Sequence, residues 1–309
     1  MAATSISSAS STRTPASAPS SVAVAVPPRT SRGLWRDAWR RLLKNRLAVG
    51  GMVFIIILVA LAILAPVIAP YDPAQLFPGT SYGKPSADHL LGTDEIGRDV
   101  LSRLLHGARV SLAVGIFVQV IILIIGSAVG GTAGYLGGRT DNFLMRLTDV
   151  FYAFPDLLFV IIITAALGSS LINIFLAIGL VNWTNLARII RGQLLSLRER
   201  EYVVAARSLG APAPRVIVAH LLPNAAGPII VTLTYGIPYA ILTEAILSFI
   251  GLGVRPPTAS WGTMIEHGSQ AIFAAPHMVL FPGLAIALTM LAFNFLGDGL
   301  RDALDPQER

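Results

Sequence analysis

The sequence of 309 residues contains no cysteine, which excludes disulfide bonds, thiolate zinc sites and thiol nucleophiles. Charged residues are also scarce, at 13% against about 25% in soluble domains, while 54% of the residues are hydrophobic. An ordinary soluble enzyme is therefore excluded. The net charge is +6, but the basic residues lie between long apolar runs and form no continuous face, so nucleic acid is not an expected partner.

The apolar runs predict an all-α membrane protein with six transmembrane helices. The first run, Leu47–Ala69, has 23 residues and would extend roughly 34 Å as a helix, which is enough to cross a bilayer. The second run, Val110–Leu136, contains three glycines spaced by four residues, which permit close helix packing. The last two spans are expected near Ala225–Leu247 and Met278–Gly297.

The uncharged stretch Leu157–Ala187 is too long for one span and too short for two. Small residues at 168–170 interrupt it, and a turn there gives spans three and four. The upstream helix must then begin near Leu147 and bring Asp149 and Asp156 into or near the membrane. A single long span would instead place the arginines that follow it outside the cell, against the positive-inside rule.

Six spans leave both ends of the chain in the cytoplasm, with 18 of the 23 basic residues on that side. A disordered Ser-, Ala- and Pro-rich tail is expected at 1–32, either a solvated bacterial tail or an organelle transit peptide. Residues 33–106 would contain a basic N-terminal helix, the first span and an external amphipathic segment. A membrane domain at 107–300 and a cytoplasmic tail at 301–309 complete the chain.

The external segment before the second span, Leu91–Arg109, has the pattern of an amphipathic helix. Thr93 is a suitable N-cap, and Asp94 and Glu95 suit the first helical turn. Apolar residues at positions 96, 100, 101, 104 and 105 share one face. We expect this helix to lie on the outer surface of the membrane.

The cytoplasmic segment 199–224 has the pattern of two short helices joined by a turn. Gly210 is a suitable C-terminal cap, and the prolines that follow it prevent continuation of the first helix. Val203, Ala206 and Leu209 would share one face, small enough to enter a groove on another protein. The pattern is compatible with a solvated loop or with a docking element.

The same segment resembles the EAA loop of ABC importer permeases. The resemblance is carried by Glu201, Ala205, Ala206, Gly210 and the closing Leu222-Pro223-Asn224. Further motifs, in matching order, look like the C-type permease subunits of dipeptide, oligopeptide and nickel importers. These motifs lie at 91–103, 247–253, 256–262 and 296–302, and the resemblance covers roughly residues 35 to 306.

The resemblance implies a type I ABC importer permease fold in the bacterial plasma (inner) membrane. Such a chain forms half of the translocation path for di- or oligopeptides, and it couples to ATPase subunits through Glu201, Ala205, Ala206, Gly210 and Pro223. The implied partners are a B-type permease, two ATPase subunits or domains, an external solute-binding protein and membrane lipid. The sequence has no phosphate-binding loop, so ATP and magnesium would be held by the partner ATPase.

The carboxylates within the predicted spans are candidates for a role in transport. Glu244 and Asp156 could neutralise the ammonium end of a peptide, or could only bond across helices, and Asp149 could pair with Arg146. The five histidines are scattered, so no metal site is predicted. Leu247-Ser-Phe-Ile-Gly lacks the strand-to-helix context of a hydrolase nucleophile, so no catalytic residue is predicted. Alternatives left open are the same architecture importing nickel, glutathione or another small solute, a polytopic membrane enzyme, and a secondary transporter driven by an ion gradient.

Overall fold

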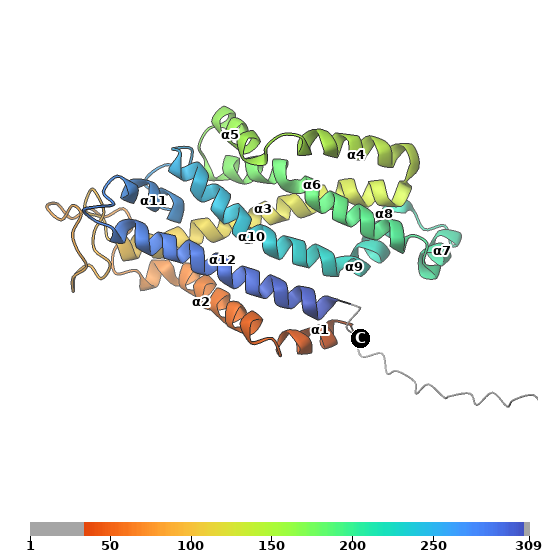
Figure 1. The fold of residues 1–309 in the computed structure, drawn as a ribbon, viewed down its shortest axis with the longest axis horizontal. Coiled ribbons are helices and arrows are strands. Elements are labelled where there is room, and N and C mark those ends of the chain that lie inside the picture. Colours follow the sequence, from red (N-terminus) through yellow and green to blue (C-terminus); the bar gives the residue numbers. More distant parts are fainter. Residues whose placement is uncertain (1–33, 306–309) are drawn as a thin grey trace, which may run out of the picture.

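A computed structural model of the chain describes residues 34–305, and in this part the regular secondary structure is helical (Figure 1). Five continuous helices are long and apolar enough to cross a membrane: α2 (Arg46–Ile68), α3 (Val100–Leu136), α6 (Leu171–Leu197), α10 (Ala226–Phe249) and α12 (His277–Leu304). The bent pair α4 (Gly138–Tyr152) and α5 (Asp156–Leu167) provides a sixth candidate. Shorter helices are α1 (Leu34–Leu42), α7 (Glu201–Ser208), α8 (Ala213–Val216), α9 (Leu222–Asn224) and α11 (Trp261–Ser269). The all-α membrane fold is confirmed, and the predicted tail at 1–32 lies outside the described residues.

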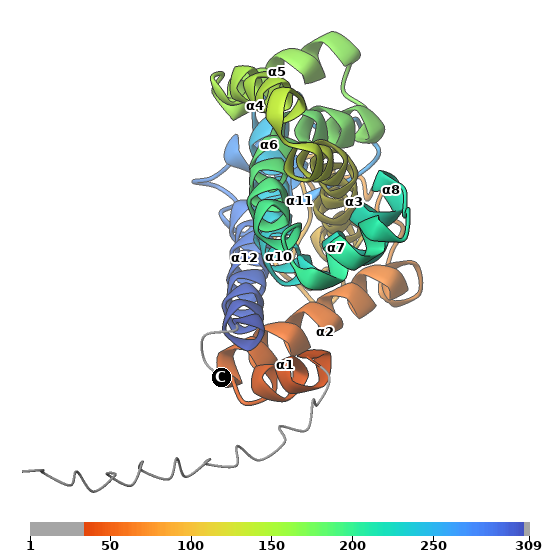
Figure 2. The same cartoon turned by 90° about the vertical axis from the view of Figure 1, so that its right-hand side faces the viewer.

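The long helices form an elongated bundle whose two ends differ (Figure 1). α7, α8, α9 and both described chain ends lie at one end, while the segment 69–99 and α11 lie at the other. Seen from the α7 end, α1 and α2 occupy one edge and α4 and α5 the opposite edge, with α3, α6 and α10 between them (Figure 2). The predicted coupling segment is therefore placed beside the two chain ends.

The α3–α6 pair is built on the three spaced glycines of the second span. Gly126 faces the side chain of Leu186, and a Cβ atom on Gly130 would lie only 2.9 Å from the Cα atom of Ala187. Contacts this short exclude any side chain larger than hydrogen, so the two backbones approach closely. The close packing predicted for these glycines is confirmed.

The predicted limits of the first and last spans are close to those observed. α2 begins at Arg46 because the side chain of Asn45 caps it, accepting a hydrogen bond from the Leu47 N–H at 3.1 Å. α12 continues to Leu304, so it extends into the region predicted as a cytoplasmic tail at 301–309. The last four residues of that region lie outside the described part.

The third span differs from the prediction of one helix that begins near Leu147. α4 already begins at Gly138, and the chain bends by 83° between α4 and α5. Pro155, immediately before α5, has no backbone N–H with which to continue α4. The predicted turn before the fourth span is confirmed, because α5 ends at Gly168 with φ +87° and Ser170 caps α6.

The amphipathic helix predicted at 91–109 is wrong for its first part. Residues 91–99 form turns, in which Gly92 and Gly97 have φ angles of +82° and +86°. These left-handed conformations interrupt a helix. The cap of α3 is accordingly Asp99, and not Thr93 as predicted. α3 therefore begins ten residues before the predicted second span and runs on without a break.

The charged residues of the segment 91–99 form ion pairs within the protein. The carboxylate of Asp94 lies 2.6 Å from Arg98 Nε and 3.3 Å from Arg103 Nε, and Arg98 Nη2 lies 2.8 Å from Glu95. Asp94, Arg98 and Arg103 are all buried. Buried charges require such partners, and the cluster fixes the segment to the start of α3.

Candidate functional site

The segment 199–224 turns at a glycine that ends α7. The Gly210 N–H donates to the Arg207 carbonyl at 2.9 Å, and the Ala211 N–H donates to the Ala206 carbonyl at 3.1 Å, the hydrogen-bond pair of a Schellman cap. Gly210 has φ +80° and open space where a Cβ would stand. This conformation costs an L side chain roughly 1–2 kcal/mol, and the predicted turn at Gly210 is confirmed.

The side chains of α7 divide between the core and the surface. Val203 is fully buried, whereas Leu209 is 88% exposed. The prediction that Val203, Ala206 and Leu209 form one docking face is therefore wrong, because Val203 packs inward with Val216 and Leu221. The exposed face consists of Glu201, Tyr202, Val204, Ala205, Arg207, Ser208, Leu209 and Gly210.

Besides following directly on α6, this segment is connected to α3 and to α10. The guanidinium of Arg207 lies 4.5 Å from the ring centroid of Tyr135, at the end of α3, a distance typical of a cation–π contact. A π-helical turn at Ile217–Leu221 and α9, which contains Pro223, lead into α10. A displacement of α7 would thus act on both α3 and α10.

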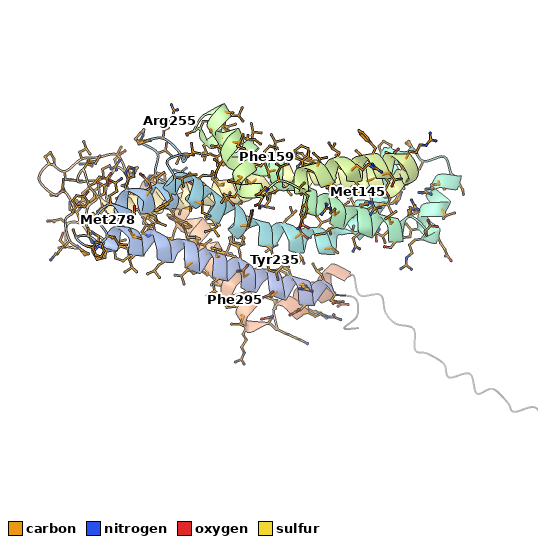
Figure 3. All side chains as sticks on the ribbon, turned by 45° about the horizontal axis from the view of Figure 1, so that its top comes forward. Met145, Phe159, Tyr235, Arg255, Met278 and Phe295 are labelled. Carbon is orange, nitrogen blue, oxygen red and sulfur yellow. The ribbon has the colours of Figure 1, made fainter. Side chains whose placement is uncertain are left out.

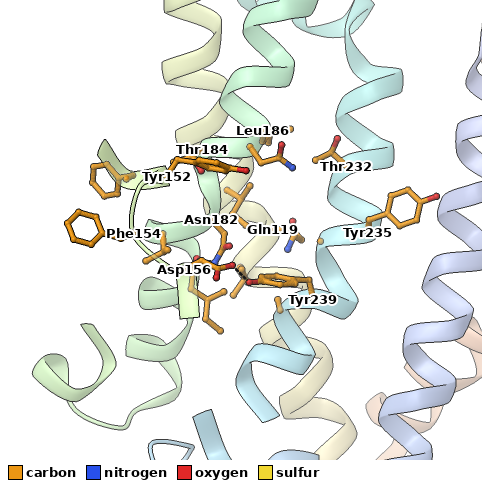
Figure 4. Close-up of a pocket in the computed structure, with 18 of the residues that line it drawn as sticks. Gln119, Tyr152, Phe154, Asp156, Asn182, Thr184, Leu186, Thr232, Tyr235 and Tyr239 are labelled. Atoms are coloured by element: carbon orange, nitrogen blue, oxygen red, sulfur yellow. Dashed lines mark hydrogen bonds between the residues drawn. The ribbon is translucent and has the colours of Figure 1, made fainter. Parts of the chain in front are cut away.

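A cavity of about 800 Å³ with both apolar and polar lining residues, which we call the central cavity, lies between α3, α6, α10 and the break between α4 and α5 (Figure 4). Its polar lining residues are Gln119, Tyr152, Asp156, Asn182, Thr184, Asn185, Thr232, Tyr235 and Tyr239. Phe151 and Phe154 add aromatic surface beside the break. Polar groups on the membrane-spanning helices of a protein mark a solute path or a buried helix contact, and a cavity favours the first.

Asp156 supplies the charge in the described lining of the central cavity. It is the first residue of α5, so the bend after α4 is what places its carboxylate at the cavity wall. The hydroxyl of Tyr239 on α10 donates a hydrogen bond to this carboxylate, drawn as a dashed line in Figure 4. The predicted path residue Asp156 therefore lies where a solute could meet it.

Glu244, the other predicted path residue, lies outside the central cavity. It is fully buried, and its Oε1 atom accepts hydrogen bonds from the hydroxyls of Ser248 and Ser260, each at 2.7 Å. Ser260 also caps α11. The structure thus does not bring Glu244 and Asp156 together, and it places Glu244 at the joint between α10 and α11.

Comparison with known families covers most of the chain. The family described as binding-protein-dependent transport system inner membrane component matches residues 122–309. The N-terminal TM domain of oligopeptide transport permease C matches residues 33–85. The chain belongs to the family of binding-protein-dependent inner-membrane transport components.

Relatives of this permease are similar over nearly its whole length. The oligopeptide transport system permease protein OppC of Bacillus subtilis is 44% identical over 90% of this chain and 92% of the relative. The dipeptide transport system permease protein DppC of the same organism is 45% identical over 91% of this chain and 88% of the relative. The glutathione transport system permease protein GsiD of Pectobacterium atrosepticum is 42% identical over 88% and 91%. The chain is thus a multi-pass inner-membrane permease of the ABC importer class.

The sequence did not reveal two ion pairs that hold α4 of the permease against α6. Arg191 donates from Nε and Nη2 to the two carboxylate oxygens of Asp141, at 2.5 and 2.7 Å. Asp149 pairs with Arg188 at 2.6 Å, and the predicted partner Arg146 is wrong. The partners are 50 and 39 residues apart, so only the tertiary fold brings them together. The spacing of Arg188 and Arg191, three residues apart on α6, does indicate that both side chains lie on the same helix face.

Proposed function

We propose that this permease forms half of the translocation path for di- or oligopeptides in an ATP-driven importer. The observation that carries the proposal is the central cavity, with one carboxylate, Asp156, and the amide side chains of Gln119, Asn182 and Asn185. A peptide offers an ammonium group to the carboxylate, and backbone amides to side chains that both donate and accept. The peptide systems in which OppC and DppC act support this solute class.

The proposal assigns the coupling function to the segment 199–224. Its exposed apolar residues, among them Leu209, suit a groove on an ATPase subunit. Closure of two ATPase subunits would displace α7, and the Arg207–Tyr135 contact and α9 would pass the displacement to the cavity helices. A B-type permease would complete the path, and a solute-binding protein would deliver the peptide. ATP and magnesium belong to the ATPase subunits, and the permease catalyses nothing.

Glutathione is a second candidate solute, because GsiD permeases are among the relatives. Glutathione carries two carboxylates and one ammonium group, so it is an anion at neutral pH. The charged residue of the described cavity lining is an acid, Asp156, and like charges repel. The lining of this half therefore favours zwitterionic di- and tripeptides over glutathione.

The test uses the permease assembled with its partner permease, ATPase subunits and binding protein in liposomes. We expect uptake of radiolabelled trialanine that requires both ATP and the binding protein, and that excess unlabelled trialanine reduces more than glutathione does. Uptake driven by an ion gradient without ATP would refute the proposal in favour of a secondary transporter. A larger reduction of uptake by glutathione than by unlabelled trialanine would leave the protein an ATP-driven importer but would identify glutathione as its solute.

A further inference from the structure

A second cavity, of about 570 Å³, lies at the end of the bundle that carries the coupling segment. We call it the end cavity. It is bounded by α1, α6, α9, α10 and α12, and its lining includes Gln193, Pro223 and Arg301. Pro223 is one of the predicted coupling residues, so the segment that would meet the ATPase also forms part of this cavity wall.

The two cavities share part of one wall on α10. Thr232 and Tyr235 line both of them. Residues of α6 and α10 line both cavities, so the two spaces follow each other along the same pair of helices. A solute that leaves the central cavity along these helices would pass Tyr235.

Contacts with α12 fix the side chain of Tyr235. Its hydroxyl donates a hydrogen bond to Asp298, and a Cβ atom on Gly297 would lie 2.9 Å from its ring. Figure 4 shows Tyr235 directed toward α12, whereas Tyr239, one turn further along α10, is directed toward Asp156. Figure 3 shows Tyr235 where α10 and α12 lie side by side. The ring thus spans from α10 to α12 at the junction of the cavities.

We propose that the end cavity is the release section of the path, which holds the transported peptide after it has left the central cavity, and that Tyr235 forms the partition between the two sections. The proposal rests on the proposed function. Movement of α9, which supplies Pro223 to the lining, would change the end cavity at the moment when α7 is displaced. Solute release is thereby coupled to the movement of the ATPase subunits through α7 and α9.

Single cysteines test the proposal, because the chain has none of its own. Asn182→Cys lies in the central cavity and Gln193→Cys in the end cavity. Gly192→Cys is the matched control, since position 192 adjoins 193 on α6 but is exposed, with open space around it. Each variant, in the complete complex, is treated with a bulky maleimide, and trialanine uptake and ATPase co-purification are measured.

We expect uptake to be lost after modification at 182 and at 193 and retained at 192, with ATPase co-purification unchanged in all three. Trialanine with ATP should also slow the modification at 193. Loss of uptake at 182 but not at 193 would overturn this inference and leave the proposed function standing. Retained uptake at both positions would count against the proposed function itself. Loss of co-purification at 193 would assign the end cavity to the ATPase interface instead.

The partition is tested in the Gln193→Cys background. Tyr235→Ala removes the ring between the cavities, and it should raise the rate at which an impermeant maleimide reaches position 193 from the side opposite α7. Tyr235→Phe keeps the ring and loses only the hydrogen bond to Asp298, so it should raise that rate less, and it serves if the alanine variant does not assemble. Equal rates in the parent and both variants would refute the role of Tyr235.

Discussion

Glu244 provides a quantitative test of how α10 and α11 are joined. Glu244→Ala removes the acceptor for the hydroxyls of Ser248 and Ser260, both buried and both at 2.7 Å. Each buried hydroxyl left without its partner costs roughly 1–3 kcal/mol, and the lost methylene adds about 1 kcal/mol. We therefore expect the free energy of unfolding to fall by roughly 3–7 kcal/mol, a large share of the total for a typical domain.

Glu244→Gln is the matched variant, because its amide oxygen can accept both hydrogen bonds. The amide nitrogen would replace Oε2, which has no partner among the described residues, so this variant should lose less stability than Glu244→Ala but more than none. The free energy of unfolding is measured by titration with sodium dodecyl sulfate in mixed micelles. A Glu244→Ala value within about 0.5 kcal/mol of the parent would refute the reasoning. Loss of trialanine uptake in a stable Glu244→Gln variant would return Glu244 to the transport path.

Three further predictions concern the cavity, the packing and the membrane surface. Asp156→Asn keeps a hydrogen-bond acceptor but removes the charge. The KM for trialanine should therefore rise by a factor that corresponds to a loss of about 1 kcal/mol or more of binding free energy; an unchanged KM would contradict the placement of Asp156 on the peptide path. Gly130→Val forces apart α3 and α6 at a cost of roughly 1–3 kcal/mol or more, which should lower the yield of folded protein in size-exclusion chromatography, whereas Gly50→Val, with open space around position 50, should not. Replacing the exposed Arg36 and Arg40 of α1 by glutamine should weaken the affinity of the detergent-solubilised permease for short-chain phosphatidylglycerol by about 1 kcal/mol per residue; equal affinity would argue against headgroup contact.

The features that could be predicted from the sequence are those set by local chemistry. Long apolar runs located the spans, and the positive φ values that glycine accepts located the turns at Gly168 and Gly210. The bend before Pro155 was not predicted, since the apolar character after it resembles one continuous span. The turns at 91–99 were missed because a helical period coexists there with two glycines, and the buried partners of Asp94 that favour the turn are visible only in three dimensions.

The candidate site shows the same division between local and tertiary information. The cost of a carboxylate in a membrane singled out both Asp156 and Glu244, but this criterion does not distinguish a cavity wall from a buried joint. Asp156 lines the central cavity because of the bend between α4 and α5, whereas Glu244 accepts hydrogen bonds from Ser248 on its own helix and from Ser260 at the start of α11. Val203 is a further example. Its spacing predicted one exposed face shared with Leu209, but the side chain of Val203 is buried in the core.

The central claim is that the segment 199–224 docks an ATPase subunit, and Gly210 tests it most directly. Gly210→Glu places a charged side chain in the exposed turn, and Gly138→Glu is the control, because Gly138 also has a positive φ and open space and is the first residue of α4, outside the segment. The measurement is co-purification of the ATPase subunits with the permease, together with trialanine uptake. We predict that Gly210→Glu loses both and that Gly138→Glu retains them. Unchanged co-purification and uptake in Gly210→Glu would contradict the account.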